Sequence, residues 1–120
     1  MTIDNRESAV TVTTASSFVE RLKGLLGHRV LPASEALLIE RCGSVHTIGM
    51  RFAIDVVFLN RQHQVLKVVG GLQPQRLAMC VGATSVLELA SGVCNGLGLI
   101  KGAQLRFASP EQSASESKSR

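Results

Sequence analysis

The chain has 120 residues, of which 45% are hydrophobic, so it can bury one modest core but not two. It contains four Phe, no Trp and no Tyr, and its 13 Lys and Arg against 9 Asp and Glu give a formal charge of +4. The basic residues stand singly between Arg21 and Arg106, without a cluster or nearby rings on which bases could stack, which argues against nucleic-acid binding.

The chain is predicted to begin with a strand and a helix. Residues 9–14 alternate apolar and polar side chains, which predicts a first strand. Ser17 and Glu20 match a capping box, apolar side chains follow at helical spacing, and Gly27 is placed to end the helix. We therefore expect the main helix over residues 17–26, packed on a sheet because a helix this short is marginal alone.

The rest of the chain is predicted to consist mainly of short strands and turns. Eleven Gly and only three Pro favour tight turns over a helix bundle. Strands are expected at 36–40, in a hairpin across 54–69, at 85–89 and at 104–107, with a short helix or turn within 91–99 and a long mixed loop around Pro74.

These elements predict one α+β domain over residues 9–107. The fold class is mainly antiparallel β: a small curled sheet or barrel-like domain with one main helix and a possible short second helix. Residues 1–8 are expected to be a flexible N-terminus. Residues 108–120 are rich in Ser, Glu, Gln, Lys and Arg and are expected to form a disordered polar tail.

The sequence also favours a soluble, cytoplasmic protein. The first residues hold no apolar signal-peptide core, and no apolar run approaches the ~18 residues that a membrane span needs. The three cysteines, Cys42, Cys80 and Cys94, are odd in number and contain no C-x-x-C pair, unlike a secreted disulfide scaffold. We expect no contact with a membrane.

The segment Val45–Leu59 is apolar but carries His46, Thr47, Arg51 and Asp55. Drawn as one extended strand, it would be half-exposed at its start and buried on both sides near its end. A structural explanation is favoured for each polar residue. A buried aspartate must find donors or a cation, and a histidine on an apolar face is more often a satisfied rim residue.

Cysteine chemistry offers two further possibilities. Cys42 and His46 could be half of a zinc site completed by Cys80 and Cys94, but they lack the tight pairs of structural zinc sites. Cys42, His46 and Asp55 also supply the residue types for nucleophilic catalysis, although Cys42 and His46 would lie ~13 Å apart in an extended strand. Buried, inert cysteines are favoured, with no metal and no cofactor.

Several segments in series resemble the domain of unknown function 192 family, whose small members occur in bacteria and archaea. The matching segments are Arg21–Leu25, His46–Arg51, Ile54–Leu59, Val86–Gly92 and Gly98–Gly102, spread over nearly all of residues 9–107. The resemblance implies a bacterial or archaeal protein with a compact β-rich domain and a small helical component, and it implies no reaction. Many members carry Lys-Asn-Thr after the matching methionine and Gly-Asp near the last turn, where this chain has Met50-Arg51 and Gly102-Ala103.

Polar residues inside apolar runs lead us to expect a polar binding cluster. Its predicted members are Arg21, His46, Thr47, Arg51, Asp55 and Glu88. The favoured hypothesis is a non-catalytic binding or accessory module for a small anion, a peptide strand or another protein partner. The alternative is a small enzyme in which His46 works as an acid or base with Asp55 or Glu88, and zinc binding is a third possibility.

Overall fold

A five-stranded sheet forms the centre of the protein. The computed structural model describes residues 1–15, 31–48 and 50–107. The sheet has the order β3-β4-β9-β6-β7, made of β3 (Thr11–Ala15), β4 (Glu35–Glu40), β9 (Ser85–Ala90), β6 (Ile54–Leu59) and β7 (Val65–Leu72). β3 and β4 run parallel, and the other neighbouring pairs are antiparallel.

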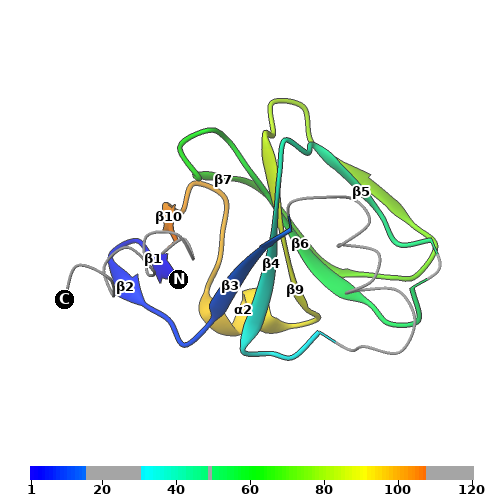
Figure 1. The fold of residues 1–120 in the computed structure, drawn as a ribbon, viewed down its shortest axis with the longest axis horizontal. Coiled ribbons are helices and arrows are strands. Elements are labelled where there is room, and N and C mark those ends of the chain that lie inside the picture. The colour runs from blue at the N-terminus through cyan, green and yellow to red at the C-terminus, as the bar shows by residue number, and fades with distance from the viewer. Residues whose placement is uncertain (16–30, 49, 108–120) are drawn as a thin grey trace.

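Two smaller sheets lie at opposite ends of the longest axis of the molecule (Figure 1). One has the order β10-β1-β2 and joins β1 (Thr2–Ile3) and β2 (Arg6–Glu7) to β10 (Leu105–Arg106). The other is an antiparallel ribbon of β5 (Ser44–His46) and β8 (Leu77–Met79). A short helix, α2 (Val93–Leu97), follows β9.

The central sheet separates two apolar clusters because side chains alternate between its faces. We call one side the closed face. It bears Leu38, Val57, Leu59, Leu87 and Leu89, which pack with Ile3 of β1, Leu105 of β10 and Cys94 of α2. The other side is the ribbon face. It bears Ile54, Val56, Phe58 and Val86, which pack with Val45 of β5 and Ala78 of β8.

The predicted fold class is confirmed, with differences at the level of elements. The hairpin and the strands near 36–40 and 85–89 are present, the short second helix is α2, and the sheets are curled but not closed into a barrel. The segment 45–59 is not one strand, since β5 ends at His46 and β6 begins at Ile54. The main helix predicted over 17–26 and the tail 108–120 lie outside the described residues.

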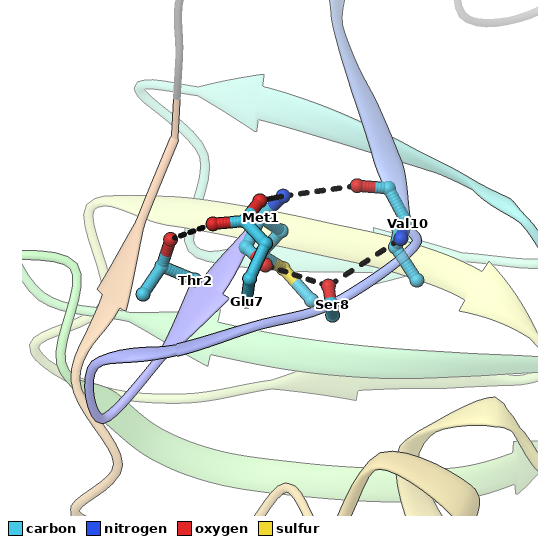
Figure 2. A network of polar contacts seen from close by, with 5 residues as sticks. All are labelled: Met1, Thr2, Glu7, Ser8 and Val10. Atoms are coloured by element: carbon cyan, nitrogen blue, oxygen red, sulfur yellow. Dashed lines mark hydrogen bonds and ion pairs between the residues drawn. The ribbon is translucent and has the colours of Figure 1, made fainter.

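The first ten residues form an arm that packs on the closed face. Ile3 is 2% exposed, and the ammonium group of Met1 donates to the carbonyl of Val10 at 3.0 Å. The hydroxyl of Ser8 donates to the carbonyl of Met1 at 2.6 Å, and that of Thr2 donates to Glu7 (Figure 2). Flexibility of residues 1–8 stays a prediction, and these contacts describe how the arm lies when it is docked.

Within the described ranges, the chain has no helix long and apolar enough to cross a membrane.

Candidate functional site

Asp55 is a buried anchor that joins three parts of the chain. It is 1% exposed on β6. Its Oδ1 accepts a hydrogen bond from the backbone N–H of Gly71 at 2.8 Å, and its Oδ2 accepts from Gly92 at 3.0 Å and Cys94 at 2.9 Å. Asp55 thereby fixes the end of β7 and the start of α2. This is the loop-anchoring role that its place in an apolar strand suggested.

Cys94 shares this buried environment. Its side chain is 2% exposed. Burial, together with the negative charge of Asp55 and a hydrogen bond to it, raises the pKa of the Cys94 thiol from 9.0 to about 12. Because the thiolate is the reactive form, Cys94 is an inert core residue at neutral pH.

Thr47 is a second buried anchor, placed at the end of the ribbon. Its hydroxyl donates to the carbonyl of Gln73 at 2.6 Å and accepts from the N–H of Arg76 at 2.8 Å. Its backbone N–H donates to the carbonyl of Arg76 at 2.8 Å, and its carbonyl accepts from the N–H of Gln75 at 3.0 Å. A threonine with no exposed surface therefore holds the loop that leads into β8.

His46 lies on the opposite side of the ribbon from the core. Val45 and Ala78 form a cross-strand pair and are buried against the ribbon face. By alternation, His46 and its cross-strand neighbour Leu77 belong to the other side of the ribbon. His46 is half-buried and Leu77 is 64% exposed.

Arg51 and Arg76 both extend from the backbone near Thr47. The N–H of Met50 donates to the carbonyl of Thr47 at 3.1 Å, which turns the chain just before Arg51. Arg76 is tied directly to Thr47 by two backbone contacts of 2.8 Å. Both arginines are exposed. The fold thus places the backbones of two arginines that are far apart in the sequence near Thr47.

The two carboxylates of the predicted cluster lie on opposite sides of the central sheet. Asp55 is paired across β6 and β9 with Leu89 and belongs to the closed face. Glu88 is 1% exposed, is paired with Val56 and belongs to the ribbon face. The predicted cluster is therefore divided between the two faces among its described members, and Arg21 lies outside the described residues.

Exposed charge has one sign over a long part of the chain. In the described residues from 41 to 107, both carboxylates, Asp55 and Glu88, are 1% exposed. All Lys and Arg residues in the same ranges are exposed: Arg41, Arg51, Arg61, Lys67, Arg76, Lys101 and Arg106. The sequence reveals the basic excess, but only the burial of both carboxylates leaves this part of the chain with exposed charges of one sign.

Exposed apolar side chains gather along the ribbon and its two loops. Leu77 and Met79 of β8 are 64% and 56% exposed. Ile48, just after β5, is 63% exposed, and Val81, just after β8, is 98% exposed. The sequence does not reveal this surface, because it predicts a long mixed loop around Pro74 and no strand at residues 77–79. The alternation of Leu77 and Met79 around Ala78 was the available signal, and three residues are too few to establish a strand period.

The geometry does not favour the zinc hypothesis. Cys94 belongs to the closed face, whereas Cys42 and Cys80 pack against the ribbon face. Among the described residues, which include His46 and all three cysteines, no group of three His, Cys, Asp or Glu side chains is close enough to hold a metal ion.

Comparison with known proteins gives one family and two related folds. The family DUF192, described as uncharacterized ACR, matches residues 1–107. A protein of unknown function from Novosphingobium aromaticivorans DSM 12444 has a TM-score of 0.67 and 20% identity, covering 80% of this chain and 72% of that chain. A candidate transcription regulator from Sinorhizobium meliloti 1021 has a TM-score of 0.71 and 20% identity, covering 81% of each chain. No curated protein matches.

Proposed function

The chain belongs to the DUF192 family, and we propose that this member is a non-catalytic binding module for an anionic ligand beside the His46–Arg51 segment. One observation carries the proposal: from residue 41 to 107, every exposed charged side chain that the structure describes is a cation. An excess of exposed charge of one sign attracts oppositely charged ligands and raises their association rate.

The members of the predicted cluster take different parts in this proposal. Arg51 and Arg76 supply positive charge, and His46 is half-buried on β5 of the ribbon. Thr47 is a positioning residue, since it holds the backbone of Arg76 through its hydroxyl. Asp55 and Glu88 contribute by being buried, because two exposed carboxylates would weaken the attraction of an anion.

The alternative of a small enzyme that pairs His46 with Asp55 gains no support from the geometry, whereas its version with Glu88, which lies on the ribbon face, stays a prediction. Both oxygens of Asp55 accept backbone hydrogen bonds, and the carboxylate lies on the closed face. An acid–base pair needs a carboxylate within hydrogen-bond reach of its histidine, at about 3 Å. His46 belongs to the ribbon, on the other side of the sheet.

A cytoplasmic location stays a prediction.

A charge-matched pair of double variants tests the proposal. Arg51→Ala with Arg76→Ala removes the cations beside Thr47, and Arg61→Ala with Lys101→Ala removes two exposed cations elsewhere. The probe is fluorescein-labelled hexaglutamate, followed by anisotropy at about 50 mM salt, where charge attraction is only partly screened. We expect the first double variant to weaken binding about tenfold, since two charge contacts contribute about 1.4 kcal/mol together.

We expect the second double variant to change binding by less than about threefold. Equal weakening by both double variants would mean that the net charge alone attracts the probe, without a site. Absence of binding by the unchanged protein at millimolar probe would also overturn the proposal.

A further inference from the structure

The outer edge of β8 has backbone groups that no strand of the described structure uses. In an antiparallel pair, residues that exchange backbone hydrogen bonds alternate with residues whose N–H and C=O groups point outward. Two backbone hydrogen bonds fix this alternation in the ribbon. The N–H of Cys80 donates to the carbonyl of Gly43 at 3.1 Å, and the N–H of Thr47 donates to the carbonyl of Arg76 at 2.8 Å. The N–H and C=O groups of Leu77 and Met79 therefore point away from β5.

Lys67 covers part of this edge. Its ammonium group reaches over from β7 and donates to the carbonyl of Met79 at 3.2 Å. Within the described ranges, this is the one contact found for the outward backbone groups of Leu77 and Met79. Lys67 is itself exposed, and its ammonium group also stands over the ring of Phe58, 6.0 Å from the ring centroid.

We propose that the outer edge of β8, Leu77–Met79, binds an extended acidic peptide segment of a partner protein by β-strand addition. This proposal rests on the proposed function, because it names the anionic ligand and the backbone that holds it. An added strand forms main-chain hydrogen bonds with the edge, while alternate side chains supply specificity. The exposed Leu77 and Met79 side chains favour apolar residues in the peptide.

The charges around the edge favour an acidic segment. Arg76 precedes the strand directly, and Lys67 stands beside its other end. When a strand is added, its N–H takes the place of the Lys67 ammonium at the carbonyl of Met79. The released ammonium is then available to a carboxylate of the peptide.

The same charges argue against a second copy of this chain as the occupant. Two copies joined edge to edge at β8 would bring two sets of Lys67 and Arg76 together, and like charges across an interface are repulsive. Nucleic acid also fits a cationic surface, but it makes no use of outward backbone groups flanked by exposed Leu77 and Met79.

Three six-residue peptides of identical side-chain charge test strand addition separately from charge attraction. One is Glu-Val-Glu-Val-Glu-Val, and another has the same sequence with N-methyl groups on the valines, which removes main-chain donors from one edge of the extended peptide. A second methylated form, on the glutamates, covers the opposite edge. We expect the unmodified peptide to bind about tenfold more tightly than at least one methylated form.

The protein variant is Met79→Pro, which removes an outward N–H and is compatible with an edge strand. Its control is Met79→Ala, which removes the side chain but keeps the N–H. We expect Met79→Pro to weaken binding of the unmodified peptide about tenfold and Met79→Ala to weaken it less than about threefold. The peptide series tests the proposal even if Met79→Pro fails to fold.

The outcomes separate this proposal from the proposed function. Equal binding of all three peptides, with loss on Arg51→Ala and Arg76→Ala, overturns strand addition and leaves the anion site intact. Absence of binding for the peptides and hexaglutamate alike overturns both. Binding of a single-stranded oligonucleotide about tenfold tighter than the peptide, or dimers through β8 at the peptide concentrations used, overturns the choice of occupant.

Discussion

The two faces of the central sheet are covered in different ways. On the closed face, Ile3, Cys94 and Leu105 from three separate elements are each no more than 2% exposed. On the ribbon face, the covering layer is a two-stranded ribbon whose inner residues are buried and whose outer residues, Leu77 and Met79, are more than half exposed. The residues that cover the closed face are buried, whereas the ribbon has a second side that is exposed.

Buried polar side chains divide along the same line. Asp55 ties β7 and α2 through three backbone N–H groups, while Thr47 ties one loop of the ribbon. If this comparison is correct, a substitution should cost most at the anchor of the closed face, less at the Thr47 anchor of the ribbon and nearly nothing on the ribbon's outer side.

The largest effect is expected from Asp55→Ala. The substitution leaves the N–H groups of Gly71, Gly92 and Cys94 without their acceptor, and each buried unsatisfied donor costs about 1–3 kcal/mol. We expect the free energy of unfolding to fall by about 3–5 kcal/mol. Guanidinium unfolding followed by far-UV circular dichroism measures this loss, since the chain has no Trp.

Glu40→Ala removes an exposed carboxylate at the end of β4 and is the control for Asp55→Ala. It should change the free energy of unfolding by less than about 0.5 kcal/mol. A loss below about 1 kcal/mol for Asp55→Ala would show that the closed face does not depend on this anchor.

The next largest effect is a pH dependence that originates at Cys94. Its pKa is raised from 9.0 to about 12, so the folded state holds the thiol proton more tightly than the unfolded state. The resulting stabilisation is complete below about pH 9 and is lost as the pH rises toward 12. Relative to Cys94→Ala, we expect the unchanged protein to lose roughly 2–3 kcal/mol between about pH 8 and 11.

The quantity to measure is the difference between the two proteins in free energy of unfolding as a function of pH, because every other charged group is the same in both. Parallel curves across this pH range would mean that the folded state does not protect the Cys94 proton. A thiol reagent at about pH 8 gives a second readout, in which Cys94 should react only on unfolding.

Thr47→Val should cost less than Asp55→Ala. Valine keeps the shape of the side chain but loses the hydroxyl that donates to Gln73 and accepts from Arg76. One buried N–H is left without its side-chain acceptor, so we expect a loss of about 2 kcal/mol in chemical unfolding. Thr13→Val, at an exposed position of the edge strand β3, should change stability by less than about 0.5 kcal/mol. A Thr47 effect equal to that of Asp55→Ala would remove the difference between the two faces.

The sequence predicts the central strands well because most of their side chains are apolar. Residues 54–59 and 85–89 are buried on both sides, and such mostly apolar runs are visible without any knowledge of their partners. The anchoring role of Asp55 was likewise predictable, since a carboxylate inside a buried strand must have donors.

The ribbon was not predictable because its strands are short and its contacts span long distances in the sequence. The hydroxyl of Thr47 binds the backbone of Arg76, 29 residues away, and nothing near either residue indicates this tie. The excess of exposed cations in residues 41–107 has the same origin. It depends on the burial of Asp55 and Glu88, which only the pairing of β6 with β9 makes definite.

The smallest effect is expected on the outer side of the ribbon, from Leu77→Ser with Met79→Ser. Both side chains are already more than half exposed, so their replacement removes little apolar surface from the folded core. The free energy of unfolding should change by less than about 0.5 kcal/mol, measured as for Asp55→Ala. Ala78→Ser, at the buried position between them, should cost more because it places a hydroxyl against the ribbon face. A double variant that destabilises more than Ala78→Ser would mean that Leu77 and Met79 support the fold, and that their exposure is not evidence of a binding surface.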